Sequence, residues 1–176
     1  GDNLITKAYY VMKNLCNEKS EFSFKVQKNI PIGAGLGGGS SNCASTLIVL
    51  NKLFKLNLSE GQLLEIGLSL GSDVPFFIKG KNSIAKGRGE LLKTIASEAN
   101  YYLIIYPDIK ISTADAFKFY EENKTDFPTD LKNDFEYFAR KVYPEINEIF
   151  NLMSQYGNVE LSGTGSSMYL NFKSSE

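Results

Sequence analysis

The sequence has 176 residues, of which 43% are hydrophobic, so it can bury the core of one ordinary domain or of two small ones. Its 19 lysines and arginines against 20 aspartates and glutamates leave a net charge of −1, which provides no basic patch for nucleic acid or for an anionic membrane surface. We expect no membrane span, because no apolar run approaches the ~20 residues that one needs, and no signal peptide.

The absence of histidine limits the possible catalytic chemistry, and the two cysteines indicate the cellular compartment. The chain contains no histidine, which excludes histidine-based triads, metal ligands and general bases within this segment. Acid–base work therefore falls to carboxylate, lysine, tyrosine or water. Cys16 and Cys43 lack the spacing of metal ligands, so we expect two reduced core cysteines in a cytoplasmic protein rather than a disulfide. For the assembly we expect a monomer or a homodimer.

Local signals set the elements of the first half of the chain. Asn3 has the position of a helix N-cap, Ser59 and Gln62 have the spacing of a capping box, and Gly71 is placed to end that helix. Apolar residues alternate with polar ones after the first helix, which predicts a half-buried strand. In chain order the predictions are a helix over 3–15, a strand over 22–30, helices over 43–54 and 60–70, short strands over 74–78 and 83–85, a turn over 86–89 and a strand over 90–94.

The second half mixes helices and strands without regular alternation, which predicts an α+β fold rather than a doubly wound sheet. Residues 95–100 are expected to link two units, and 124–132 to form a polar loop. In chain order the predicted elements are a strand over 101–106, helices over 114–122, 135–139 and 145–156, and strands over 159–161 and 168–172.

A glycine-rich run between the strand over 22–30 and the next helix is the clearest functional signal. It places five of the fifteen glycines within positions 33–39. Glycines let a backbone approach a ligand closely, and the free N–H groups and dipole of a helix N-terminus attract anions. A plain tight turn needs only one or two glycines, so the run favours phosphate or nucleotide binding. It reads Pro31, Ile32, Gly33, Ala34, Gly35, Leu36, Gly37, Gly38, Gly39, Ser40 and Ser41.

Two well-known phosphate loops fit this run poorly. The P-loop pattern needs a lysine where Gly39 stands. The dinucleotide pattern G-x-G-x-x-G is met by Gly33, Gly35 and Gly38, but it needs a second strand ending in an acidic residue about 20 residues later. Glu60, the acidic residue in that region, lies at a predicted helix start, so the dinucleotide interpretation is a weak alternative.

The run resembles the loop P-x-x-x-G-L-x-x-x-S-S of the GHMP kinases, which phosphorylate small metabolites with ATP. The match covers Pro31, Gly35, Leu36, Ser40 and Ser41, and further segments follow in family order over essentially the whole chain. These segments are 70–77 (L-G-S-D-V-P-F-F), 85–90 (A-K-G-R-G-E), 133–136 (N-D-F-E) and a second glycine loop over 161–166. The triple glycine is most similar to the branch that acts on a cytidine diphosphate-linked methylerythritol in non-mevalonate isoprenoid biosynthesis.

The resemblance implies a fold in two parts. Residues 1–95 would form the ATP-binding N-terminal domain, which resembles domain 2 of ribosomal protein S5 and lacks its first strands here. Residues 96–176 would form a ferredoxin-like C-terminal domain. The family pattern P-A-K-x-N, whose lysine partners the catalytic aspartate, is not present in this sequence. We therefore expect this chain alone to be weakly active or inactive.

The resemblance also assigns roles to single residues. Asp73 would be the catalytic carboxylate that orients the attacking hydroxyl, where the residue alone reads as an ordinary Asx-turn aspartate. Residues 31–41 would hold ATP, and Ser41 would also face Mg²⁺. The second glycine loop would pack against the first and shape the site, or it is a plain turn between two strands.

Thr113 and Phe117 fall where the family places substrate-side residues, and the aromatic ring there would stack on cytosine. The alternative for Phe117 is a core position on an amphipathic helix. Two other functions stay open: another GHMP kinase acting on a substrate of the homoserine or mevalonate type, and a non-catalytic nucleotide-binding relic.

Overall fold

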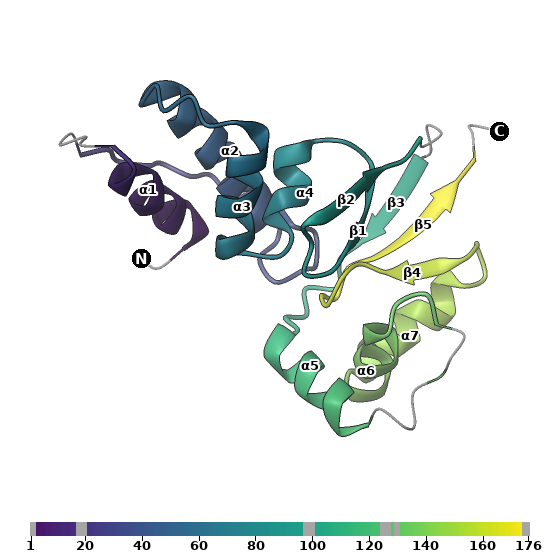
Figure 1. Cartoon of the computed structure of the whole chain (residues 1–176). Coiled ribbons are helices and arrows are strands. Elements are labelled where there is room, and N and C mark those ends of the chain that lie inside the picture. Colours follow the sequence, from purple (N-terminus) through teal and green to yellow (C-terminus); the bar gives the residue numbers. More distant parts are fainter. Residues whose placement is uncertain (1–2, 17–20, 97–100, 124–127, 129–130, 174–176) are drawn as a thin grey trace. The chain divides into compact units, whose positions relative to one another are not determined.

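A computed structural model describes residues 3–16, 21–96, 101–123, 128 and 131–173 (Figure 1). Contacts along the chain divide it into two compact units, which are described separately. Unit 1 comprises residues 1–28 and 37–97, and unit 2 comprises residues 29–36 and 98–176. Helices and two small antiparallel sheets make up the fold, so the predicted α+β class is confirmed. The family domains over 1–95 and 96–176 stay a prediction.

Unit 1 consists of helices followed by a hairpin. Asn3 caps the first helix by accepting a hydrogen bond from the Thr6 N–H, and Ser59 and Gln62 form the predicted reciprocal capping box. The hairpin pairs Ser83 with Thr94 across the predicted turn. Its elements are α1 (Leu4–Asn14), α2 (Gly38–Leu53), α3 (Glu60–Leu70), α4 (Val74–Lys79), β1 (Ser83–Lys86) and β2 (Leu91–Thr94).

The core of unit 1 forms where α2 contacts α1 on one side and α4 on the other. Met12 of α1, Leu47 of α2 and Val74 of α4 are all fully buried in one cluster. Burying a side chain such as that of Leu47 stabilises the fold by about 1.5–3 kcal/mol. Cys43 lies in the same cluster as a free thiol, and this burial raises its pKa to about 11. The core thus fixes the start of α4 against α2.

Two predicted strands of unit 1 are wrong. Residues 22–30 form no strand, because the described part of the chain offers them no ladder partner. Residues 22–30 are all exposed rather than half-buried, although Phe22 and Phe24 both make T-shaped contacts with the ring of Tyr9. Residues 74–78 are helical rather than extended, and Pro75 lies in the first turn, where its missing N–H costs no hydrogen bond.

Unit 2 is a three-stranded antiparallel sheet with three helices. The strand order is β3-β5-β4, with Leu103 opposite Leu170 and Leu161 opposite Met168. The predicted elements are confirmed, although α6 runs three residues beyond the predicted end at 139 and α7 ends three residues before the predicted end at 156. Of the predicted link and polar loop, residues 97–100, 124–127 and 129–130 lie outside the described residues. The elements are β3 (Tyr101–Ile105), α5 (Thr113–Glu122), α6 (Phe135–Val142), α7 (Pro144–Met153), β4 (Val159–Leu161) and β5 (Met168–Phe172).

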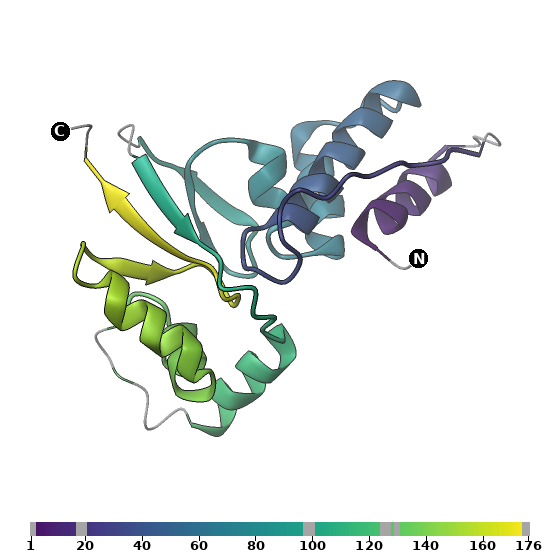
Figure 2. The same ribbon diagram turned by 180° about the vertical axis from the view of Figure 1, so that it is seen from behind.

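The helices α6 and α7 cover one face of this sheet, as both views show (Figures 1 and 2). Phe138 and Ile146 pack there against Leu161, Met168 and Leu170, all of them buried. Side chains alternate across a strand, so Glu160 and Tyr169 point to the opposite face. The sheet therefore presents a polar and aromatic surface next to the loop that joins β4 to β5.

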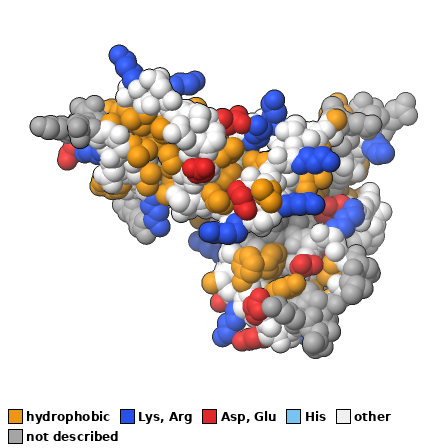
Figure 3. Space-filling view, in the orientation of Figure 1, with side chains coloured by type: hydrophobic (Ala, Val, Ile, Leu, Met, Phe, Trp, Pro, Cys, Tyr) orange, Lys and Arg blue, Asp and Glu red, His pale blue; other side chains and the backbone are white. Residues whose placement is uncertain are grey.

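Not all large apolar side chains are buried. In unit 1, Tyr10, Val49 and Leu53 are exposed, and Figure 3 shows hydrophobic side chains gathered over α1 to α3. No helix in the described part of the chain is long and apolar enough to cross a membrane.

Candidate functional site

The first glycine loop, residues 31–41, is shared between the two units, and the boundary falls at its centre. Residues 31–36 belong to unit 2, and Gly37 begins the stretch that enters α2 in unit 1. Gly33, Gly35 and Gly37 all have positive φ, the backbone conformation that glycine adopts without strain. Gly35 needs glycine for a second reason, since a Cβ there would lie 2.0 Å from the Ser162 carbonyl oxygen. The glycine density of this run therefore reflects both backbone conformation and close packing.

The second glycine loop, which joins β4 to β5, packs on the first half of this run. The Ser162 hydroxyl donates to the Gly35 carbonyl at 2.9 Å, and the Ser167 N–H donates to the Ala34 carbonyl at 3.1 Å. A Cβ on Gly165 would lie 2.1 Å from backbone atoms of both Ala34 and Gly35. The two loops thus touch through their backbones, which confirms the predicted packing and excludes a plain turn.

The second half of the run starts α2 and leaves its N-terminus open. Gly37 is the N-cap in a left-handed conformation, and no side chain caps the helix. The first N–H groups of an α-helix have no partner within it, so those of Gly38, Gly39 and Ser40 are available to an anion, aided by the helix dipole. Ser40 and Ser41 are half-buried in this first turn. The arrangement suits a phosphate group.

The other residues of the run differ in exposure. Ile32, Gly33 and Gly39 are exposed, Pro31 and Leu36 are half-buried, and Ala34 is buried under the second glycine loop.

Asp73 lies at the start of α4, on the same unit as the open helix N-terminus. Its side chain is exposed and makes no capping hydrogen bond. Phe77, four residues later, packs so closely on Gly37 that a Cβ there would lie 2.6 Å from its ring. Residues four apart on a helix are neighbours about 5–6 Å apart, so the Asp73 carboxylate is one helical turn from the contact with the glycine loop. The packing of α4 on α2 thus places a carboxylate near the phosphate-binding candidate.

The hairpin of β1 and β2 packs against the turn that carries Asp73. Gly89 has a φ of 114°, and a Cβ at this position would lie 2.0 Å from the Ser72 carbonyl oxygen. Only glycine lets these two backbones approach so closely. The segment over 85–90 therefore supports the position of the carboxylate.

The two substrate-side candidates lie on α5 in unit 2. Thr113 begins the helix, and its hydroxyl is 3.0 Å from that of Thr164 in the second glycine loop. Phe117 is 52% exposed, and its ring makes a T-shaped contact with that of Phe135, with 4.9 Å between the centroids. The core position considered for Phe117 is therefore wrong. Thr113 joins the second glycine loop, whereas Phe117 offers an open aromatic ring one turn along the same helix.

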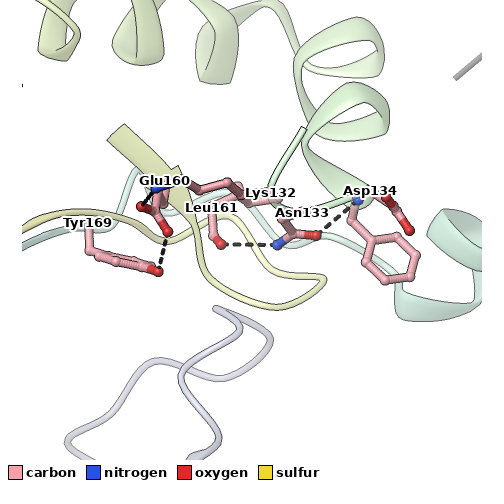
Figure 4. Close-up of a pocket in the computed structure, with 7 residues that line it drawn as sticks. Lys132, Asn133, Asp134, Glu160, Leu161 and Tyr169 are labelled. Carbon is pink, nitrogen blue, oxygen red and sulfur yellow. Dashed lines mark hydrogen bonds and ion pairs between the residues drawn. The ribbon is translucent and has the colours of Figure 1, made fainter. Parts of the chain in front are cut away.

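Sequence reasoning missed a polar cluster beside the second glycine loop. It lines a pocket of about 420 Å³ on unit 2, where Glu160 accepts hydrogen bonds from Lys132 at 2.6 Å and from the Tyr169 hydroxyl at 2.8 Å (Figure 4). The hydrogen bond from Lys132 is the main reason that the pKa of Glu160 lies below its usual range. Burial, with the bond to Glu160, raises the pKa of Tyr169 to about 12, so the phenol remains a donor. The segment over 133–136 was the available signal for this cluster.

Residues 3–81 match the family described as GHMP kinases N terminal domain. The chain is 41% identical over 177 residues to the 4-diphosphocytidyl-2-C-methyl-D-erythritol kinase of Acinetobacter baylyi, covering 95% of this chain and 63% of that protein. It is 39% identical over 181 residues to the enzyme of the same name from Vibrio cholerae, covering 98% of this chain and 62% of that protein. The chain thus spans somewhat less than two thirds of the length of these curated relatives.

A solved structure shows the same likeness in three dimensions. The crystal structure of a 4-(cytidine 5'-diphospho)-2C-methyl-D-erythritol kinase superposes with a TM-score of 0.80 and 28% sequence identity, covering 97% of this chain and 69% of that one. The family match includes the first glycine loop and Asp73, and the matches to the relatives and to the solved structure cover nearly the whole chain. The chain belongs to the GHMP kinase family.

Proposed function

We propose that the protein transfers a phosphoryl group from ATP to a hydroxyl of 4-diphosphocytidyl-2-C-methyl-D-erythritol, a step of non-mevalonate isoprenoid biosynthesis. The observation that carries this proposal is the open N-terminus of α2 behind glycines of positive φ, with the Asp73 carboxylate one helical turn from the contact between Phe77 and Gly37. The relatives that match nearly the whole chain are named for that substrate.

The glycine run would hold the phosphates of ATP. Backbone N–H groups at the start of α2 would donate to phosphate oxygens, and the hydroxyls of Ser40 and Ser41 would add to them. Gly35, fixed by the second glycine loop, would keep the first half of the run in place. In this arrangement residues 31–41 form the nucleotide site without a P-loop lysine.

The residues present also fit Mg²⁺ held mainly by phosphates. Among the described residues, no three Asp, Glu, His or Cys side chains converge as a metal site. Mg²⁺ commonly keeps several waters and few protein ligands beside substrate phosphates, and it supplies charge stabilisation in phosphoryl transfer. Ser41, in the first turn of α2, is the side chain that we propose to face the ion.

Asp73 would act on the acceptor rather than on ATP. Phosphoryl transfer depends on positioning, with one group that orients the attacking hydroxyl and takes its proton. The exposed carboxylate of Asp73 makes no capping hydrogen bond that would occupy it, and the packing of Gly89 on Ser72 fixes its turn. These features suit a positioned general base.

The substrate-side proposal rests on α5. The ring of Phe117 would stack on cytosine through its face, because about half of this side chain is exposed beside its T-shaped contact with Phe135. Thr113 would contribute a hydroxyl beside the second glycine loop.

The free thiols of Cys16 and Cys43 accord with the proposed cytoplasmic location.

A panel of acceptors tests the proposal. The full-length gene product is incubated with MgATP and either diphosphocytidyl-methylerythritol, homoserine or mevalonate, and ADP release is followed by a coupled assay. We expect ADP release with the cytidine-linked acceptor, together with phosphorylated product in a mass spectrum. Turnover of homoserine or mevalonate instead would reassign the substrate, and ATP binding without turnover of any acceptor would identify a nucleotide-binding relic.

A further inference from the structure

The side chain of Asn133 makes three hydrogen bonds to the backbones of three different residues. Its amide nitrogen donates to the carbonyl of Leu161 at 3.0 Å and to that of Gly163 at 2.9 Å, about 30 residues away in sequence. Its amide oxygen accepts from the Phe135 N–H at 3.0 Å, which closes a turn at the start of α6 (Figure 4). Two donors and one acceptor are thus satisfied at once, a combination that only an amide supplies at this length.

The two carbonyls that Asn133 holds flank a single residue, Ser162. The Ser162 hydroxyl donates to the carbonyl of Gly35 in the first glycine loop. The Ser162 carbonyl in turn accepts the Gly165 N–H at 3.2 Å, and the Ser162 N–H donates to Ser167 at 2.8 Å. Asn133 therefore binds the carbonyl groups of the residues before and after Ser162, the residue that joins the two glycine loops.

The residue before Asn133 strengthens this attachment. Lys132 pairs with Glu160 at 2.6 Å, and Asn158 donates to the same carboxylate oxygen at 3.1 Å. Consecutive residues 132 and 133 thus hold consecutive residues 160 and 161 at the end of β4. The surface ion pair contributes little free energy by itself, so the specific restraint on the loop comes from the amide.

We propose that Asn133 is a positioning residue for the nucleotide site. It sets the conformation of residues 161–163, which set Ser162 against Gly35 and so shape the first glycine loop. The inference rests on the proposed function, because it assigns Asn133 a place in ATP binding. It touches neither nucleotide nor acceptor in this scheme, and its effect passes through the Ser162 hydroxyl.

Two substitutions separate this role from that of a local turn. Asn133→Asp keeps an oxygen for the Phe135 N–H, loses both donors and brings a carboxylate against two carbonyl oxygens. Asn133→Ala loses all three hydrogen bonds. Asp134→Asn is the matched control, since it exchanges the same two groups in the opposite direction at the adjacent exposed residue, which makes no capping bond.

Amide hydrogen exchange gives the direct readout, and ATP kinetics give the functional one. For Asn133→Asp we expect exchange at Gly165 and Ser167 to become about five- to tenfold faster, as the loss of a typical hydrogen bond implies, with Phe135 unchanged. The KM for ATP should rise by a similar factor, and Asp134→Asn should leave both readouts unchanged.

The proposal is overturned if Asn133→Asp leaves exchange at Gly165 and Ser167 at the wild-type rate, or if only Asn133→Ala has an effect and that effect is confined to Phe135. A wild-type protein that phosphorylates no acceptor would refute the proposed function. The exchange rates, with ADP binding in place of kinetics, would still decide the role of Asn133.

Discussion

Gly165→Ala is the substitution for which the structure gives the sharpest expectation. The new Cβ would lie 2.1 Å from the Ala34 carbonyl carbon and from the Gly35 nitrogen, and an ordinary contact is 3.4 Å or more. Both partners are backbone atoms, so no side chain can turn away. Gly165 is not among the glycines of positive φ, so alanine brings no conformational strain of its own. The two loops must therefore separate by about 1.3 Å.

Such a separation breaks the contacts that join the loops. Overpacking of this kind costs about 1–3 kcal/mol. The hydrogen bonds from Ser162 to Gly35 and from Ser167 to Ala34 are stretched as well, and each contributes about 1 kcal/mol. If about 2 kcal/mol of this falls on the conformation that binds nucleotide, the Kd for ATP rises about 30-fold.

Isothermal titration with ATP and thermal unfolding check this expectation on the full-length gene product. Gly61→Ala is the matched control, because its Cβ would meet nothing closer than 4.0 Å in helix α3. There alanine should stabilise the helix by about 0.5–1 kcal/mol and leave ATP affinity unchanged. A Gly165→Ala variant with wild-type ATP affinity and wild-type Tm would refute the claim that the loops depend on backbone contact.

Three further substitutions probe other parts of the molecule. Gly89→Ala should lower kcat more than tenfold without weakening ATP binding, because its Cβ would lie 2.0 Å from the Ser72 carbonyl next to the proposed base; wild-type kcat would contradict this. The stabilisation from Glu160, whose pKa is held below the usual 4.5, is complete above that pH and lost as the pH falls further. Glu160→Gln should therefore flatten the acid side of the stability curve, and an unchanged curve would argue against the pairing. Gly67→Ala should destabilise the protein by about 1–3 kcal/mol in denaturant titrations, since its Cβ would lie 2.6 Å from the Ile78 Cδ1 and 3.0 Å from Cγ1 of the fully buried Val74; wild-type stability would show that α3 and α4 adjust to the added methyl group.

Local signals predicted the elements that depend on neighbouring residues. The cap at Asn3 and the capping box at Ser59 act within four residues, and both are present as expected. The prediction was wrong where pairing or packing decides. The alternation over 22–30 needs a partner strand, and the short apolar run over 74–78 fits a buried strand as well as a helix. Pro75 in its first turn was the signal that favoured the helix.

In the candidate site, too, features set by neighbouring residues were predicted, and contacts between distant residues were not predicted from local patterns. The anion-binding character of residues 31–41 follows from their own glycines and the helix after them. The contact of Ser162 with Gly35, 127 residues apart, follows from no local pattern and was implied only by the family resemblance. The hydrogen bonds from Asn133 to residues 161 and 163 were not predicted, because an asparagine before a helix usually bonds to the backbone of its own turn.

Asp73→Asn tests the proposed role of Asp73 as the general base of a phosphoryl transfer supported by the α2 N-terminus. Steady-state kinetics with MgATP and diphosphocytidyl-methylerythritol give kcat, and titration gives the Kd for ATP, with Glu65→Gln on exposed α3 as control. We expect kcat to fall by about 10²- to 10⁴-fold while the Kd for ATP stays at its wild-type value. Wild-type kcat in Asp73→Asn would contradict it.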